Sequence, residues 1–381
     1  LAVDEELLVI GHTDILPAGA LGNLARRSCF PSPKEDQLKR VVMSSFLFVA
    51  LVGSACAASE GEIGVTADNC SVSSPVNGRE LRIVTTVAPI TSLVAQVVGD
   101  GGAQIVGLVP EGTNSHTFEP PPSAAAVVEQ ADVVFMNGLV LEEPTKDLAS
   151  SNAKDNAVIC ELGTAILPEE QWIFDFSFPV EGGKPNPHLW TNPPMAREYA
   201  ELIRDVLSSL DPSSAETYAE NFNLLATQID ELDVAMSTAT QSLPEAKRLL
   251  LTYHDAYAYF AKQYNWTVVG AIQPSSFDEP TPKDIANLVD QIRARGVPAI
   301  FGSEVFPSPV LEQIGAETGT RYIDVLRDDD LPGESGESDH SWQGLMRFNF
   351  VTMVEALGGD ASSLRQLTMA PAVVDRAEYA K

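Results

Sequence analysis

Short runs rich in β-branched residues alternate with stretches of helical spacing in two separate parts of the chain. The first alternation runs from the strand-like residues 81–87 to residues 157–160, and the second runs from residues 248–252 to the helical stretch 342–357. Strands that alternate with helices predict a parallel sheet whose strands are joined by crossover helices. The sequence therefore predicts an α/β fold with two lobes, each built on a parallel sheet flanked by helices.

A long helical stretch separates the two alternations. Residues 195–244 have apolar residues at helical intervals, interrupted by Asp211-Pro212. The second part, over residues 215–243, predicts one helix of roughly 40 Å at about 1.5 Å per residue, which is longer than one lobe needs. We expect residues 195–244 to form a rigid connector between two lobes. The predicted lobes span residues 80–194 and 245–381.

The residues before the first lobe resemble an export signal followed by a leader. Lys39-Arg40 precedes a short apolar run at 46–51, and small residues follow around Cys56. This order is typical of a secretory signal, and the apolar run is too short to span a membrane. Two outcomes are open: cleavage near Ala57, or lipidation of Cys56. We expect an exported chain, either periplasmic or anchored to the outer face of the cytoplasmic membrane, with residues 1–57 as extension and signal and 58–79 as a flexible leader.

Two further questions concern the start of the chain and its cysteines. The signal begins late, so either residues 1–37 are disordered or the true start lies near Leu38 or Met43. Cys70 and Cys160 lie in the predicted mature chain, and an exported protein can pair them. The sequence does not show that these two cysteines are close together, so the disulfide is left open.

The charge of the chain excludes one class of partner. The sequence has 24 basic and 53 acidic residues, for a formal net charge of −29. A protein that binds nucleic acid needs a basic surface to neutralise phosphates. The sequence therefore predicts no nucleic-acid partner.

Three histidines lie at equivalent places in the predicted layout. His116 follows a strand, His188 follows a long predicted loop at 163–187, and His254 lies at the end of a strand. Open α/β sheets bind ligands beyond the carboxyl ends of their strands, so these side chains can converge between the lobes. Imidazole is a common metal ligand, and a closed tetrahedral site needs a fourth ligand, for which the run at 328–330 is the obvious source. The sequence predicts a metal site of three histidines and one aspartate.

Several segments, in the right order over roughly residues 80–360, resemble the zinc/manganese solute-binding proteins of ABC importers. The first metal motif of that family resembles residues 112–120 (GTNSHTFEP), the second resembles 187–190 (PHLW) and the third resembles 253–257 (YHDAY). The run 327–333 (RDDDLPG) occupies the position of the fourth ligand and is most similar to the AztC-type zinc receptors. Many members with a long loop near the second motif fill it with histidines, and this chain has none there.

The resemblance implies a function, a ligand set and partners. Carried over one by one, the family's ligands fall on His116, His188, His254 and one aspartate, for which Asp329 fits the family pattern best and Asp328 and Asp330 are alternates. It implies an exported receptor, not an enzyme, that captures one ion between its lobes and delivers it to an ABC permease with its cytoplasmic ATPase. The subgroup adds a zinc metallochaperone as a further partner, and we expect a monomer.

Zinc is favoured over manganese as the ion. Three imidazoles and one carboxylate suit tetrahedral zinc, whereas manganese prefers more oxygen ligands. Ligand histidines usually hold their second ring nitrogen in an outer hydrogen bond, and we name Glu119, Asp255 and Glu304 as candidates for that role. Two alternatives to a receptor remain: a surface adhesin or lipoprotein that the metal only stiffens, and a zinc hydrolase, for which no His-Glu-x-x-His sequence is present.

Overall fold

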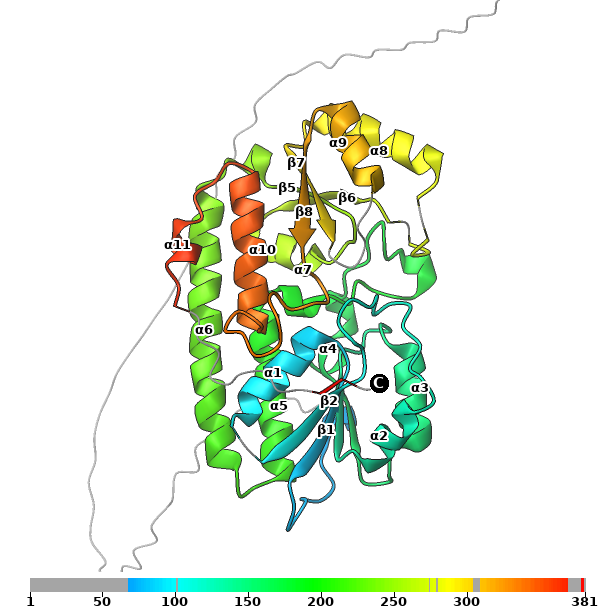
Figure 1. Cartoon of the computed structure of the whole chain (residues 1–381), viewed down its shortest axis with the longest axis vertical. Coiled ribbons are helices and arrows are strands. Elements are labelled where there is room, and N and C mark those ends of the chain that lie inside the picture. The colour runs from blue at the N-terminus through cyan, green and yellow to red at the C-terminus, as the bar shows by residue number, and fades with distance from the viewer. Residues whose placement is uncertain are drawn as a thin grey trace, which may run out of the picture. The chain divides into compact units, whose positions relative to one another are not determined.

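The computed structural model describes residues 68–100, 102–273, 275–278, 280–303, 309–368 and 378–379 (Figure 1). All of them fall in one compact unit of the chain. The predicted signal, Cys56 and the two candidate starts lie outside the described residues. In the part of the chain that is described, no helix is both long and apolar enough to cross a membrane.

The N-terminal lobe is built on a five-stranded parallel sheet. Its strands run in the order β4-β3-β1-β2-β9, so the last strand of the chain closes the edge at β2. The strands are β1 (Leu81–Thr85), β2 (Ala103–Gly107), β3 (Val133–Met136), β4 (Val158–Glu161) and β9 (Glu378–Tyr379). The helices of this lobe are α1 (Ala88–Val98), α2 (Ala124–Gln130), α3 (Glu143–Asn152) and α4 (Leu162–Ile166). Parallel strands need crossover connections, which these helices supply.

The C-terminal lobe is built on a four-stranded parallel sheet in the order β6-β5-β7-β8. Its strands are β5 (Leu249–Thr252), β6 (Thr267–Ala271), β7 (Ala299–Ser303) and β8 (Arg321–Leu326). Its helices are α7 (Ala258–Tyr264), α8 (Pro282–Arg295), α9 (Pro309–Thr318), α10 (Trp342–Ala356) and α11 (Ser362–Arg365). The two parallel sheets flanked by helices confirm the predicted fold class.

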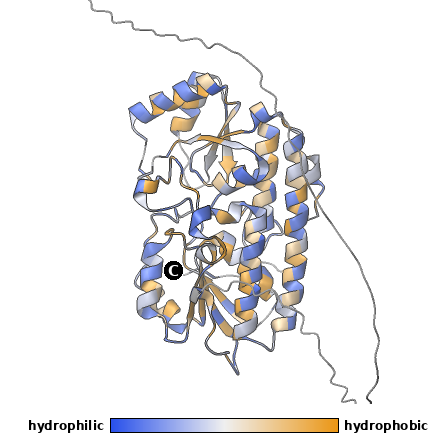
Figure 2. Cartoon of the chain, turned by 180° about the vertical axis from the view of Figure 1, so that it is seen from behind, coloured by the Kyte–Doolittle hydropathy of each residue, from blue (hydrophilic) through white to orange (hydrophobic). Residues whose placement is uncertain are grey.

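Two helices join the lobes: α5 (Pro193–Leu210) and α6 (Ala215–Gln241). Helix α6 packs against α5 and α1 on one side of the molecule and against α10 and α11 further along (Figure 1). One apolar cluster includes buried residues of both sheets and of α6, from Ile83 through Leu225 to Phe301. Figure 2 shows the strands of both sheets mostly in the hydrophobic colours. The connector is therefore part of a shared core, because its apolar face lies against both lobes.

The structure differs from the sequence-based expectation in several elements. Helix α3 was not predicted, because it is polar and buries few side chains, among them Thr145 and Ala149. Helix α7 begins at Ala258, so the segment 254–257, expected to be helical, is a loop. The long loop expected at 163–187 contains helix α4 and two short 3₁₀ turns. Strand β9 was not expected, since two residues are too few to show a strand pattern.

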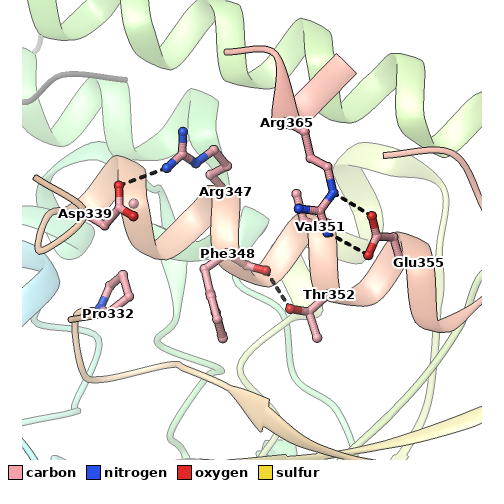
Figure 3. A pocket seen from close by; sticks show the side chains of 9 residues that line it. Pro332, Asp339, Arg347, Phe348, Val351, Thr352, Glu355 and Arg365 are labelled. Atoms are coloured by element: carbon pink, nitrogen blue, oxygen red, sulfur yellow. Dashed lines mark hydrogen bonds and ion pairs between the residues drawn. The ribbon is translucent and has the colours of Figure 1, made fainter. Parts of the chain in front are cut away.

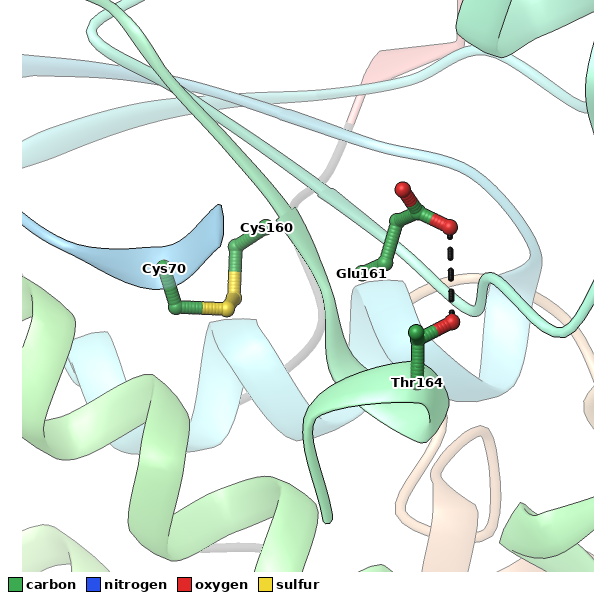
Figure 4. Close-up of a disulfide and its surroundings, with 4 residues drawn as sticks. All are labelled: Cys70, Cys160, Glu161 and Thr164. Atoms are coloured by element: carbon green, nitrogen blue, oxygen red, sulfur yellow. Dashed lines mark hydrogen bonds between the residues drawn. A yellow bond between two sulfur atoms is a disulfide. The ribbon is translucent and has the colours of Figure 1, made fainter. Parts of the chain in front are cut away.

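A disulfide joins Cys70 to Cys160 (Figure 4). Cys70 ends a short 3₁₀ turn (Asp68–Cys70) before β1, and Cys160 lies in β4, the outer strand of the first sheet. Both cysteines are buried in the main apolar cluster. The bond that the sequence left open therefore ties the start of the described chain to the edge of the N-terminal lobe.

Candidate metal centre

The three predicted histidines meet at the loops that follow the strands. The Nε2 atoms of His116 and His188 are 3.1 Å apart, those of His116 and His254 are 3.1 Å apart, and those of His188 and His254 are 3.0 Å apart. His188 and His254 are buried, and His116 is partly exposed. Two of these side chains come from the N-terminal lobe and one from the C-terminal lobe. Among the described residues, this is the group of acidic, histidine and cysteine side chains that is close enough to hold a metal ion.

Amide side chains fix the tautomer of two of these rings. The Nδ1 atom of His188 is 2.8 Å from Oδ1 of Asn186, and the Nδ1 atom of His254 is 3.0 Å from Oε1 of Gln273. An amide oxygen only accepts, so each Nδ1 carries the proton and donates it. The Nε2 atoms of His188 and His254 are consequently unprotonated in the neutral rings, and their lone pairs point to a common centre. Such an outer hydrogen bond is the usual support of a metal-binding histidine.

The triangle of nitrogen atoms fits a tetrahedral cation. With zinc–nitrogen bonds of about 2.0–2.1 Å, neighbouring nitrogens of a tetrahedron are roughly 3.3–3.4 Å apart, close to the distances between the three rings. Burial lowers the pKa of His116 and of His188 well below the usual value, and each is lowered further by its neighbouring histidines. Burial also lowers the pKa of His254. Neutral rings at neutral pH leave the Nε2 lone pairs for a metal ion.

The aspartate run beside the histidines is buried. Asp328, Asp329 and Asp330 are each less than one tenth exposed, so none of them forms the solvated acidic turn that composition alone would suggest. An oxygen of Asp328 lies 3.9 Å from Nε2 of His254, and the other accepts from the hydroxyl of Ser303. Burial raises the pKa of Asp329, and the charge of His254 opposes that rise. Asp328 therefore lies where a carboxylate would complement a cation held by His254, and Asp329 is near enough for its charge to act on His254. Neither carboxylate belongs to the group of described side chains that is close enough to hold one ion, which consists of the three histidines.

Asp329 and Asp330 also hold the loop that carries His116. Oδ2 of Asp329 accepts from the backbone N–H of Ser115 at 3.1 Å, and both oxygens of Asp330 lie 2.8 Å from the backbone nitrogen of Gly112. Oδ1 of Asp329 is buried and has no hydrogen-bond partner among the described residues. A buried carboxylate oxygen without a donor is costly unless a cation or proton joins it. Asp330 thus links the two lobes through the backbone of Gly112, and Oδ1 of Asp329 remains able to bind a further partner.

The other predicted residues have different places. Glu119 is exposed, and Glu304 lies outside the described residues. The side chain of Asp255 is buried without a hydrogen-bond partner among the described atoms, and its backbone oxygen accepts from Asn186. Burial and the nearby charge of Asp175 raise the pKa of Asp255 well above its usual value. His340 is buried 3.8 Å from an oxygen of Glu111, apart from the three histidines.

A small cavity of mixed polar and apolar lining, called the vestibule below, reaches the site at His116. It is a cavity of about 160 Å³, and besides His116 it is lined by apolar side chains and a few polar ones: Leu139, Val140, Leu141, Ser177, Phe178, Pro179, Gly182, Lys184, Pro185, Pro187, Ser275 and Phe277. Leu139, Val140 and Phe277 have φ angles of 52°, 62° and 60°. Left-handed backbone costs a non-glycine residue about 1–3 kcal/mol and is concentrated at functional sites. These three strained residues all line the same vestibule.

A second, larger cavity of about 450 Å³ lies beside α10 (Figure 3). Its carboxylates are already paired: Asp339 with Arg347 at 2.9 Å, and Glu355 with Arg365 at 2.7 Å. No histidine lines it. Its chemistry therefore does not compete with the three-histidine site for a metal ion.

The sequence did not identify the groups that support the histidines. Asn186 and Gln273 hold the rings, and Phe178 and Phe277 lie against them. The position of Asn186, two residues before His188, was the one local signal, because a side chain at that spacing can reach the ring that follows it. Gln273 is 19 residues from His254, so only the pairing of β5 with β6 brings these two side chains together.

Known proteins are similar to this chain in architecture and, at 26–28% identity, in sequence. The sequence model of the family described as zinc-uptake complex component A, periplasmic, matches residues 83–356. The manganese-binding lipoprotein MntA of Halalkalibacterium halodurans is 27% identical over 323 residues, which are 84% of this chain and 99% of MntA. The iron-binding protein YfeA of Yersinia pestis is 28% identical over 258 residues, which are 68% of this chain and 80% of YfeA. The periplasmic zinc-binding protein TroA of Treponema pallidum has a TM-score of 0.66 at 26% identity, covering 74% of this chain and 99% of that one.

The fold and the site define an exported receptor for a metal ion. The chain belongs to the zinc-uptake complex component A family, since that family's model matches most of its length. Receptors of this family bind a metal ion for an ABC importer, working with its permease and ATPase components, and are not enzymes. The metal named for its relatives is zinc, manganese or iron, depending on the relative.

Proposed function

We propose that this receptor captures one zinc ion between its lobes and delivers it to the permease of an ABC importer. The observation that carries the proposal is the triangle of three Nε2 atoms, with sides of 3.0–3.1 Å. Three imidazoles form a nitrogen-rich site, which suits zinc, whereas manganese favours oxygen ligands. In this proposal residues 80–194 and 245–381 act as the two lobes, except that strand β9 pairs in the sheet of the N-terminal lobe, and residues 195–244 act as the connector.

The proposed ligands are His116, His188, His254 and Asp329. Asp329 is chosen as the fourth ligand because its Oδ1 is buried without a donor, whereas its Oδ2 already holds the loop of His116. Release would require His254 and Asp329 to part from His116 and His188, since the two pairs belong to different lobes. The permease would supply that separation. Loading by a zinc metallochaperone, which the subgroup resemblance supports, belongs to the same proposal, as does a monomeric state.

Zinc titration of the metal-stripped protein beside a His254→Ala variant tests the proposal. We expect one tightly bound zinc per chain, counted by mass spectrometry, and a loss in the variant larger than the about 10- to 100-fold typical of residues outside the ligand set. Competition with manganese should leave zinc bound. Absence of tight zinc binding, or equal affinity in the variant, would show that the histidines are not the site.

The fourth ligand is tested by a matched pair of substitutions. Asp329→Asn and Asp328→Asn remove the same charge from neighbouring buried positions, and Asn keeps one oxygen that can accept a hydrogen bond. We expect the larger loss of zinc affinity in Asp329→Asn. A larger loss in Asp328→Asn would instead assign the ligand to the carboxylate that lies 3.9 Å from His254.

A further inference from the structure

Two phenylalanines, one from each lobe, lie against the three histidines. The ring of Phe277 stacks on His116, with centroids 4.5 Å apart and an angle of 20° between the planes. The ring of Phe178 has its centroid 5.7 Å from that of His116 and 5.8 Å from that of His188. The two phenylalanine rings are themselves 6.1 Å apart. Both also line the vestibule, as His116 does.

Each phenylalanine is connected to a histidine of its own lobe. In the N-terminal lobe, Asp175 accepts from the backbone N–H of Phe178 at 2.9 Å and from the side chain of Asn186 at 3.1 Å. Asn186 in turn holds the ring of His188. The ring of His188 and the backbone of Phe178 are therefore positioned by one series of hydrogen bonds through Asp175 and Asn186.

The C-terminal lobe has the same arrangement with fewer steps. The amide nitrogen of Gln273 donates to the backbone oxygen of Phe277 at 3.1 Å, and its amide oxygen accepts from His254 at 3.0 Å. One side chain thus sets both the histidine ring and the phenylalanine that covers it. The two lobes reach the same result with unrelated residues.

We propose that Phe178 and Phe277 form an apolar cover that keeps water out of the coordination shell and so makes the site select an ion satisfied by four protein ligands. This inference rests on the proposed zinc site and adds residues that determine its specificity. Zinc is stable with four ligands in a tetrahedron, whereas manganese favours six, mostly oxygen. With only four protein ligands, a six-coordinate ion would need two water molecules at the site. Rings packed on His116 and His188 occupy the side from which water in the vestibule would approach.

The test uses Phe178→Ala, Phe277→Ala and the double variant. Co²⁺ replaces zinc as a probe, because tetrahedral Co²⁺ absorbs visible light far more strongly than five- or six-coordinate Co²⁺. We expect the wild-type complex to absorb strongly and the variants to absorb weakly. We also expect the ratio of manganese to zinc affinity to rise by about 10- to 100-fold, the range that groups around the ligands typically control.

Phe176→Ala is the matched control. Phe176 lies two residues from Phe178 on the same segment, but it is 49% exposed and is not among the residues that line the vestibule. It should leave both the cobalt spectrum and the affinity ratio unchanged. Phe178→Leu, which keeps an apolar side chain over the rings, should restore most of the wild-type behaviour. If Phe178→Ala does not fold, Phe277→Ala carries the test, because the ring of Phe277 is partly exposed.

The outcomes separate the cover from the metal site itself. A tetrahedral cobalt spectrum that persists in the double variant, with an unchanged affinity ratio, would overturn the cover while leaving the zinc receptor intact. A cobalt spectrum that changes as strongly in Phe176→Ala as in Phe178→Ala would also overturn the proposed cover. The change in the spectrum would then come from a general disturbance of the segment that holds both residues. If His254→Ala does not weaken zinc binding in otherwise wild-type protein, the proposed function fails and the cover fails with it.

Discussion

The two lobes hold their metal-facing side chains in different ways. The N-terminal lobe is cross-linked by Cys70 and Cys160, whereas the strands and helices of the C-terminal lobe contain no cysteine. His188 and His254 are each oriented by an amide of their own lobe. The loop of His116 is instead held by aspartates of the opposite lobe. Two histidine rings are therefore each oriented by an amide of their own lobe, whereas the loop that carries the third is held by carboxylates of the other lobe.

Removing the disulfide is expected to lower the free energy of unfolding more than any other proposed change. It should also remove the cross-link that distinguishes the N-terminal lobe from the C-terminal lobe. Replacing both cysteines, Cys70→Ser with Cys160→Ser, opens a loop whose ends are 90 residues apart. For a loop of this length the free energy of unfolding should fall by about 4–5 kcal/mol, because the unfolded chain gains freedom. Thermal unfolding measures the loss, and hydrogen exchange should rise first in β3 and β4. Equal exchange in β7 and β8 would show that the cross-link does not distinguish the lobes.

A pH series on Glu142→Gln tests a second feature of the N-terminal lobe, with a smaller effect. The buried carboxyl of Glu142 accepts from Thr86 and from the backbone of Asn137 and Gly138, and burial raises its pKa to about 7. A raised pKa means that the folded state keeps a proton that the unfolded chain has already lost. The stabilisation is present below pH about 4.5 and is lost as the pH rises through about 7, by about 3 kcal/mol in total.

The variant has no ionisable group at position 142, so its stability should lack this decline between about pH 4.5 and about pH 7. Chemical denaturation of metal-free wild type and variant at a series of pH values measures the difference. Parallel pH profiles would mean that Glu142 is ionised in the folded protein at neutral pH and does not contribute the slope.

The smallest expected effect compares the two supporting amides directly. Asn186→Ala and Gln273→Ala each remove the acceptor that orients one histidine ring. Loss of such an outer partner typically weakens metal binding by about 10- to 100-fold. We expect similar losses in the two variants, measured by competition for zinc with a chelator. A loss confined to one variant would show that only one lobe presents an oriented histidine.

The fold could be predicted well from the sequence, because alternation of strands and helices is a local pattern. The strands near residues 81, 133, 249 and 299 follow from short apolar runs, of which the first two are rich in β-branched residues, and the long helix α6 follows from helical spacing. Helix α3 was missed because its polar sequence has little apolar periodicity. Strand β9 was missed because a two-residue pairing depends on the edge of β2, which lies far away in the sequence.

The sequence by itself determined the two-lobed α/β class and the three histidines, since few histidines are present and these three lie in predicted loops or at strand ends. Only the tertiary structure decided that their Nε2 atoms meet within 3.1 Å and that Cys70 reaches Cys160. The tertiary structure also decided that the aspartates are buried and bind the backbone of the loop that carries His116. It likewise decided that Phe178 and Phe277 lie against the histidine rings. These features depend on contacts between segments up to 218 residues apart. No local pattern records such contacts, because they arise only when the loops of two sheets converge.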